Sequence, residues 1–206
     1  MVVLPVFLQA PWVRLHPFSA TLFTAVLMAV GIVLEQTADR QKAEIGQLLV
    51  GFSGSWLAGC LFWGWLRAHP LLHLPVEAFA LPLALTGLNS RWRLAAAFYL
   101  SSLLGTACTD LMMAVTGVMQ AWPTVVMAPI DVAPGLLHQA GLQLLHPLPM
   151  LLLALAAALI LGLGRRWSQM GSTWSMAGAV LVTTVWVDGL FLITALLQPG
   201  LSGLIE

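Results

Sequence analysis

The sequence predicts an all-α fold, a polytopic transmembrane bundle of about six helical spans. Hydrophobic residues make up 60% of the 206 residues and charged residues only 8%, whereas soluble domains contain about 45–50% and about 25%. The mean hydropathy of +0.93 agrees with this. Because a span and its loop take roughly 30–35 residues, we expect a single transmembrane domain over residues 1–206.

The first three spans are expected at about 17–34, 46–66 and 71–88. Residues 1–16 are interpreted as an apolar, interfacial lead-in. Residues 35–44 carry both signs of charge and separate the first two spans. The third span contains Pro75 and Pro82, each of which removes a backbone hydrogen bond. We therefore expect it to be kinked or re-entrant, with its broken backbone covered by protein or water.

The last three spans are expected at about 94–118, 147–164 and 173–197, each an apolar run. Three prolines mark a long loop after the fourth span: Pro123, Pro129 and Pro134. Within this loop, residues 135–145 are expected to form a short helix on the membrane surface. Arg165 and Arg166 mark the polar connection between the fifth and sixth spans.

Basic residues in the loops predict the orientation, because cytoplasmic loops carry the excess of Lys and Arg. With six spans, the loops on the side of the termini carry Arg14 and Arg67. The loops on the opposite side carry Arg40, Lys42, Arg91, Arg93, Arg165 and Arg166. We therefore expect both termini on the non-cytoplasmic side of a cell inner membrane or a thylakoid membrane.

Three acidic residues fall inside predicted spans, where an ionisable side chain is costly and suggests a functional site. Glu77, Asp110 and Asp188 each lie a few residues from the middle of a span, toward the side of the termini. At about 1.5 Å of rise per residue, all three are expected in one layer, roughly 4–6 Å from the midplane. Carboxyl groups that share a dry site can hold protons in common, as a proton relay or a cation site requires.

Hydroxyl groups accompany these acids at helical spacing. Ser102 and Thr106 share a helical face with Asp110, and Thr184 precedes Asp188 by one turn. The candidate intramembrane polar site therefore consists of Glu77, Asp110, Asp188, Thr106, Ser102 and Thr184. A structural role is the alternative for each acid, because a buried Asp can also bond the backbone of a neighbouring helix.

All five histidines map to the side of the termini. His69, His73 and Glu77 are spaced by four, which is one face of a helix, and such imidazoles can hold a metal or an axial site of haem or chlorophyll. Pro70 and Pro75 disturb the helix here, and the spacing assures no third ligand. We therefore expect interfacial histidines and no metal, and keep His69 and His73 as a candidate ligand cluster. Any cofactor stays unknown.

Gly51-Phe52-Ser53-Gly54 resembles the serine motif of rhomboid intramembrane proteases, whose partner histidine lies in a later span. The topology places Ser53 and His138 near opposite sides of the membrane, too far apart for a nucleophile and its base, so we expect no enzyme activity. Small residues four apart instead predict close helix packing. Such faces are Ala25 with Ala29, Gly51 with Ser55 and Gly59, and Ala154 with Ala158 and Gly162.

Three stretches together resemble a family of cyanobacterial integral membrane proteins described as a domain of unknown function. They are GFSGSWLAGCLFWGWLRAHPLLHLPVEAF (residues 51–79), YLSSLLGTACTDLMM (99–113) and VDGLF (187–191). The resemblance covers most of the chain. It implies a cyanobacterial membrane, thylakoid or plasma, and brings no activity or site residues with it.

Two functions fit these observations. The first is a small carrier or transporter component with a proton- or cation-linked acidic site, and the second is a non-catalytic accessory or assembly protein of a larger, pigment-associated membrane complex. A vitamin-binding subunit of an energy-coupling transporter has a similar size, but its termini are usually cytoplasmic. A water-filled cavity among spans three, four and six would favour transport, and a dry core would favour assembly. Expected partners are the lipid bilayer and a membrane-protein partner or oligomer, and zero net charge argues against nucleic acid.

Overall fold

The structure is a computed structural model and describes residues 3–201, which form helices and connecting turns without a strand. The α-helices are α1 (Val3–Leu15), α2 (Pro17–Glu35), α3 (Arg40–Leu61), α4 (His73–Glu77), α5 (Leu81–Gly87), α6 (Arg93–Val115), α7 (Val118–Met127), α8 (Ala133–Leu144), α9 (Pro147–Ser168) and α10 (Ser172–Leu197). Short helical turns are η1 (Phe62–Leu66, a π-helix) and η2 (Pro70–Leu72), η3 (Ala78–Ala80) and η4 (Pro199–Leu201), all three 3₁₀.

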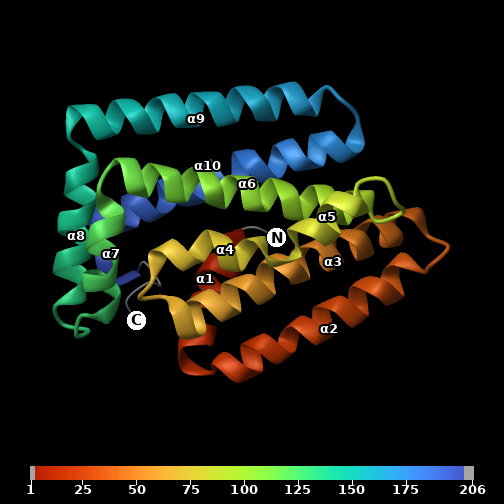
Figure 1. The fold of residues 1–206 in the computed structure, drawn as a ribbon, viewed down its shortest axis with the longest axis horizontal. Coiled ribbons are helices and arrows are strands. Elements are labelled where there is room, and N and C mark those ends of the chain that lie inside the picture. Colours follow the sequence, from red (N-terminus) through yellow and green to blue (C-terminus); the bar gives the residue numbers. More distant parts are fainter. Residues whose placement is uncertain (1–2, 202–206) are drawn as a thin grey trace.

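Six helical stretches of the described chain are long and apolar enough to cross a membrane. They are Pro17–Glu35, Arg40–Leu66, Pro70–Gly87, Arg93–Val115, Pro147–Ser168 and Ser172–Leu197. Figure 1 shows them side by side and roughly aligned, with short connections between them at one end. The prediction of an all-α, multi-pass transmembrane bundle is confirmed.

The third span is kinked, and its two halves α4 and α5 continue in one direction through the bundle (Figure 1). Pro75 and Pro82 lack the N–H groups that a continuous helix needs, and the 3₁₀ turn η3 lies between the halves. The buried side chain of Tyr99 in α6 hydrogen-bonds two backbone groups at this turn through its hydroxyl. It donates to the carbonyl oxygen of Glu77 and accepts from the backbone N–H of Ala80 at 3.1 Å. This satisfies polar groups that lipid could not satisfy.

The N-terminal helix α1 packs into the bundle, so the predicted interfacial lead-in is wrong for its described part. Val13 is fully buried, and Gln9 is 7% exposed. The amide nitrogen of Gln9 donates to the carbonyl oxygen of Trp56 at 2.6 Å and lies 3.2 Å from the Sγ atom of Cys60. The apolar sequence of α1 is compatible with either the membrane interface or the interior of the bundle. The hydrogen bonds of Gln9 explain why a polar side chain is tolerated inside the bundle.

Helices α7 and α8 lie across one end of the bundle, transverse to the spans (Figure 1). Helix α8 was predicted at residues 135–145, whereas α7, with Pro123 inside it, was not. The fourth span ends at Val115 rather than 118, because Gly117 adopts a left-handed φ of 80° that breaks the helix. The indole N–H of Trp122 donates to the carbonyl oxygen of Arg67 at 2.9 Å and fastens α7 to the end of the second span.

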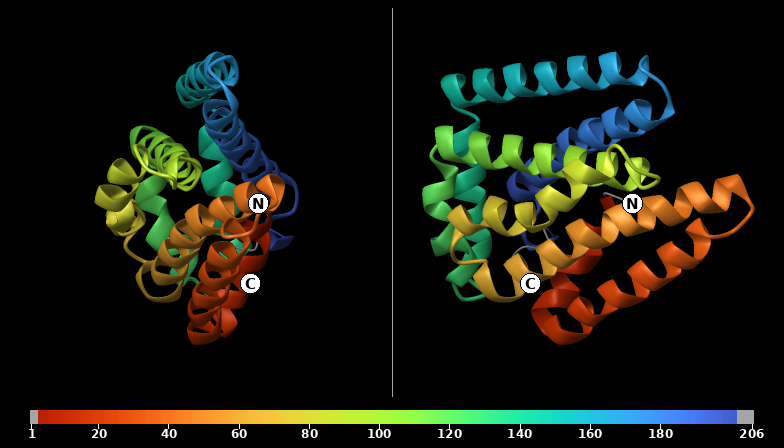
Figure 2. Two further views of the ribbon diagram at one scale, coloured as in Figure 1. Left: turned by 90° about the vertical axis from the view of Figure 1, so that its right-hand side faces the viewer. Right: turned by 45° about the vertical axis from the view of Figure 1, so that its right-hand side comes forward.

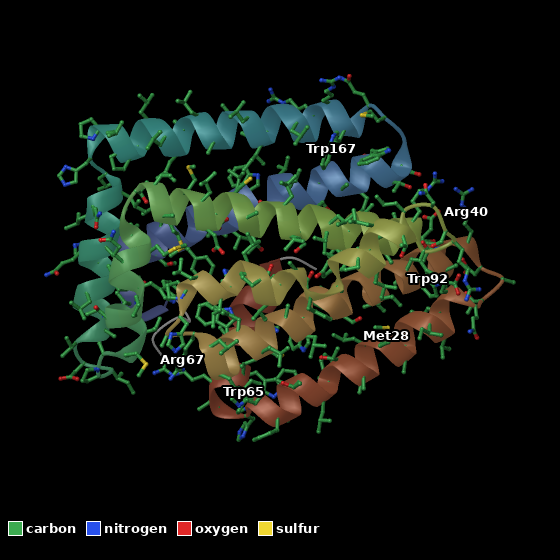
Figure 3. All side chains as sticks on the ribbon, viewed as in Figure 1. Met28, Arg40, Trp65, Arg67, Trp92 and Trp167 are labelled. Atoms are coloured by element: carbon green, nitrogen blue, oxygen red, sulfur yellow. The ribbon has the colours of Figure 1, made fainter. Side chains whose placement is uncertain are left out.

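Basic residues gather at the end opposite α7 and α8, around the connections α2–α3, α5–α6 and α9–α10 (Figure 3). Helix α3 begins there because the Asp39 carboxylate accepts from the backbone N–H groups of Gln41 and Lys42.

At the other end of the bundle, the pKa of Arg14 lies below its usual value, first because the guanidinium is partly buried and second because Arg67 is near.

Glycines mark the closest helix approaches. A Cβ atom on Gly51 would lie 2.5 Å from the Ala95 carbonyl oxygen of α6, and one on Gly59 would meet the Gln9 side chain. The other two small-residue faces point away from the neighbouring helices of the described chain. Their residues are exposed: Ala25 and Ala29 on α2, and Ala154, Ala158 and Gly162 on α9. Figure 2 shows why for α9, which stands at the edge of the bundle against α10.

Candidate functional site

A partly open cavity of about 520 Å³ lies among the helices, bounded by α1, α3, α4, α6 and α10 and reaching α7, α8 and α9. This volume is within the roughly 300–1,000 Å³ of small-molecule sites. Most of the lining is apolar. The three intramembrane acids, Glu77, Asp110 and Asp188, all line this one cavity.

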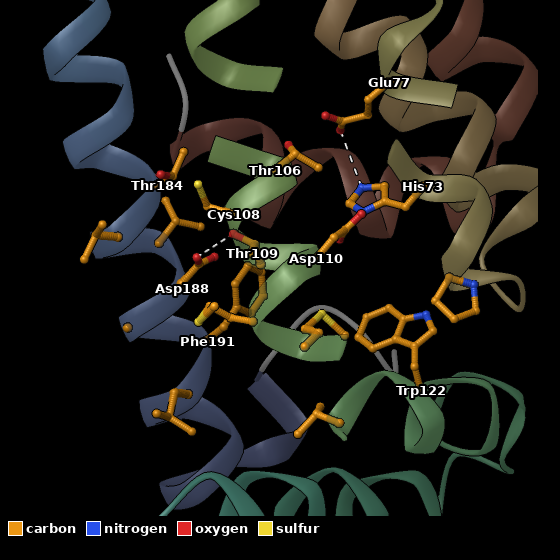
Figure 4. Close-up of a pocket in the computed structure, with 18 of the residues that line it drawn as sticks. His73, Glu77, Thr106, Cys108, Thr109, Asp110, Trp122, Thr184, Asp188 and Phe191 are labelled. Carbon is orange, nitrogen blue, oxygen red and sulfur yellow. Dashed lines mark hydrogen bonds and ion pairs between the residues drawn. The ribbon is translucent and has the colours of Figure 1, made fainter. Parts of the chain in front are cut away.

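His73 joins two of the acids (Figure 4). Its Nδ1 atom lies 2.9 Å from Oδ1 of Asp110 in α6, and its Nε2 atom lies 3.5 Å from Oε1 of Glu77, one turn along α4. The side chains of His73, Glu77 and Asp110 are 21%, 15% and 12% exposed. The imidazole also lies against the Phe62 ring, with 4.3 Å between centroids. Phe62 begins the π-helical turn η1, an irregularity common at functional sites.

The contacts of His73 favour an extra proton in this group. A carboxylate oxygen can only accept a hydrogen bond, and so can a ring nitrogen that carries no proton. The 2.9 Å contact with Asp110 is a hydrogen bond, and the 3.5 Å approach to Glu77 is an ion-pair distance. Both contacts are satisfied by an imidazolium between two carboxylates or by a neutral imidazole with one protonated acid. Both arrangements hold one proton more than a neutral imidazole with two carboxylates would. We call Glu77, His73 and Asp110 the triad, and its charge in either arrangement is one negative unit.

Asp188 approaches the triad from α10. Its Oδ2 atom accepts from the hydroxyl of Thr109 at 2.7 Å, and Thr109 is adjacent to Asp110 in α6. Figure 4 shows Asp188 and the triad on opposite sides of the α6 backbone segment that carries Thr109 and Asp110. Asp188 is exposed and lines the same cavity as the triad, but it does not bond His73.

A close helix crossing positions Thr109 and Asp188. A Cβ atom on Gly105 would lie 2.5 Å from Cγ2 of Thr184, so α6 and α10 touch at this point. Thr109 and Asp188 lie one turn further along each helix, which brings their side chains together. The crossing is tight because Gly105 has no side chain.

The predicted hydroxyl residues Ser102, Thr106 and Thr184 also line the cavity. Thr184 donates to the carbonyl oxygen of Leu181 at 2.7 Å within its own helix. The six residues of the candidate polar site are thus brought to one cavity, although only some of them contact one another.

The candidate ligand cluster is not brought together. His69 is exposed and precedes the 3₁₀ turn η2, which begins at Pro70, so the helical spacing to His73 is broken. Within residues 3–201, no group of three or more His, Cys, Asp or Glu side chains is arranged to hold a metal ion.

Ser53 and His138 have separate surroundings. Ser53 is fully buried and donates to the carbonyl oxygen of Val50 at 2.7 Å. The Nδ1 atom of His138 lies 3.3 Å from the carbonyl oxygen of Ala195 in α10.

Sequence reasoning missed the pairing of His73 with Asp110. It also missed the contribution of Gln9 and Trp122 to the cavity. The spacing of His73 and Glu77 showed that they share a face, but it could not show which face of α6 opposes it. Gln9 carried a usable signal, because a lone amide within an apolar stretch needs hydrogen-bond partners.

One comparison with known proteins gave a match. The family described as "Protein of unknown function (DUF3120)" matches residues 1–196. No curated protein and no solved structure matches the chain. Because the family match covers nearly the whole sequence, the chain belongs to the DUF3120 family of proteins of unknown function.

Proposed function

We propose that this membrane protein is a small carrier, or the binding component of one, that takes a ligand into its interior cavity and couples binding to proton exchange. The observation that carries the proposal is the triad at the wall of the cavity: Nδ1 of His73 is 2.9 Å from Asp110, and Nε2 is 3.5 Å from Glu77. The proton held between these groups limits the negative charge of the triad, and a charged ligand that enters the cavity can displace a proton from the acids that line it.

The location of the triad supports exchange rather than a purely structural role. Structural acids inside membranes are commonly paired with backbone or hydroxyl groups of a neighbouring helix. Here two acids share one titratable imidazole, and a third acid faces the same cavity. Imidazole suits a proton relay because its charge changes within the physiological pH range in ordinary surroundings.

A second candidate is an accessory or assembly protein of a larger membrane complex. The exposed small residues Ala25 and Ala29 on α2, and Ala154, Ala158 and Gly162 on α9, favour it, because such faces allow close approach of a partner helix. A pull-down from native membranes in mild detergent distinguishes the two candidate functions. The assembly role predicts a stoichiometric partner, and the carrier role does not require one.

The orientation is also a proposal. We infer that the end with Arg40, Lys42, Arg91, Arg93, Arg165 and Arg166 is cytoplasmic. The α7–α8 cover and the C-terminal end of α10 would then face the non-cytoplasmic side of an inner or thylakoid membrane. The predicted location of the two termini on that side falls on residues 1–2 and 202–206, outside the described part of the chain. The acids of the cavity would exchange protons with that side.

Infrared spectroscopy of the protein in lipid membranes tests the proposed function without a ligand. With eight Asp and Glu residues in the chain, carboxyl C=O bands can be assigned by substitution. We expect the bands of water-shielded carboxyl groups, either the C=O stretch of a protonated acid or the stretches of a carboxylate beside the imidazolium, to change when the buffer is taken from mildly acidic to alkaline pH. Asp110→Asn should remove or shift one of these bands.

Asp131→Asn is the matched control, because it removes the same charge from an exposed loop residue and should leave the bands unchanged. A wild-type spectrum with no pH-dependent shielded carboxyl would overturn the proposal. So would an Asp110→Asn spectrum identical to that of the wild type.

A further inference from the structure

We propose that the ligand of the cavity is an organic monocation with an apolar body, such as a lipophilic amine or quaternary ammonium compound, and that Asp188 binds its charged group. This inference rests on the proposed function and adds the chemical class of the ligand. Three observations support it: the charge of the lining, its aromatic side chains and the accessibility of Asp188.

The cavity is selective for positive charge. The described residues that line it include Glu77, Asp110 and Asp188 but no Lys or Arg. His73 is shared between Glu77 and Asp110, so it offsets only one of the three carboxylates. An anionic ligand would meet uncompensated negative charge in a medium that screens poorly.

Asp188 is the acid open to a ligand. Glu77 and Asp110 are held by His73 and are mostly buried. Asp188 is exposed, lines the cavity and accepts a hydrogen bond from the Thr109 hydroxyl on Oδ2. A cation beside Asp188 would form a charge-assisted contact without breaking the triad.

Aromatic side chains in the lining would contact the apolar body of the ligand. The lining includes Phe52, Trp56, Phe62, Trp63, Phe98, Trp122 and Phe191. Aromatic faces attract organic cations through their quadrupole and contact apolar groups as well. An inorganic cation fits less well, because Ca²⁺ or Mg²⁺ needs about six or more oxygen ligands, and residues 3–201 contain no His, Cys, Asp or Glu group arranged for a metal.

Binding of the cation is coupled to release of a proton. Two negative units, one on the triad and one on Asp188, are costly together in an apolar cavity. When no cation is bound, the carboxyl group of Asp188 therefore carries a proton. When the cation enters, the carboxyl group of Asp188 releases its proton to water. The carboxylate that forms then pairs with the cation, and the charge of the site stays constant.

Binding of tetraphenylphosphonium to the purified full chain in mild detergent tests the inference. Tetraphenylborate has the same shape and the opposite charge, so it serves as the matched probe. A scintillation-proximity assay counts only the ion bound to the protein. We expect tetraphenylphosphonium to bind at least about tenfold more tightly than tetraphenylborate, which corresponds to about 1.4 kcal/mol.

Asp188→Asn should weaken tetraphenylphosphonium binding by about tenfold or more, whereas Asp188→Glu should retain most of it and Asp131→Asn all of it. Equal binding of the two probes by the wild type overturns the inference even if the Asn variant fails to fold. Unchanged binding by a folded Asp188→Asn variant overturns the role of Asp188. A wild type that binds neither probe also contradicts the inference, while the infrared result on Asp110 decides the proposed function separately.

Discussion

Replacement of Tyr99 by Phe tests how the broken third span is stabilised. Tyr99 is the single tyrosine of the chain and is 4% exposed. Its hydroxyl bonds two backbone groups at the kink, the carbonyl of Glu77 and the N–H of Ala80. The Phe variant keeps the ring and loses both bonds, so it isolates the effect of the hydroxyl.

The expected cost follows from the two groups left without a partner. An unsatisfied buried polar group costs about 1–3 kcal/mol, and partial relaxation of the kink reduces the sum for two groups to about 2–3 kcal/mol. For a chain of this size, 1 kcal/mol corresponds to roughly 2–4 °C in the midpoint of thermal unfolding. We therefore expect Tyr99→Phe to lower the midpoint by about 5–10 °C.

Thermal unfolding in detergent can be followed by the fluorescence of the nine tryptophans. Thr183→Val is the control, because the exposed Thr183 hydroxyl bonds only the Ala179 carbonyl of its own helix. Its midpoint should stay within about 2 °C of the wild type. A Tyr99→Phe midpoint equal to that of the control would refute the claim that this hydroxyl completes the backbone hydrogen bonding of the kink.

Three further predictions concern packing, the triad and orientation. Gly105→Leu should separate α6 from α10 and destabilise the protein by about 1–3 kcal/mol, whereas Gly162→Leu, where no atom lies within 4 Å, should be neutral in the same unfolding assay. Asp110→Leu should cost about 1–3 kcal/mol by leaving its hydrogen-bond partner unsatisfied, and Asp110→Asn should cost less because the amide still offers an acceptor; equal losses would contradict this account. Single cysteines at Gln169 and Gln198 should be labelled by an impermeant maleimide from opposite sides, Gln169 from the cytoplasm, and labelling of Gln198 from the cytoplasm would invert the proposed orientation.

The sequence predicts the spans well because lipid imposes a strong constraint on helix length and polarity. The prolines of the third span likewise predict its kink, since each removes a known hydrogen bond. What the sequence could not show is how the kink is completed. Tyr99 is distant from Glu77 and Ala80 along the chain, and no local pattern connects them.

The candidate site is only partly predictable for the same reason. Depth along each span placed Glu77, Asp110 and Asp188 in one layer, because helix rise is regular. Rotation about each helix axis is set by packing, so the contact of His73 with Asp110 could not be derived. The burial of α1 beside the cavity was also missed, because an apolar segment shorter than a span suits either an interface or a protein interior.

Calorimetry of tetraphenylphosphonium binding in buffers with different heats of ionisation tests the link between ligand and proton most directly. The dependence of the binding enthalpy on the buffer gives the number of protons released per bound cation. The account predicts about one proton released by the wild type near neutral pH and fewer by Asp188→Asn. A wild type that binds the cation with no proton release would contradict the proposed exchange.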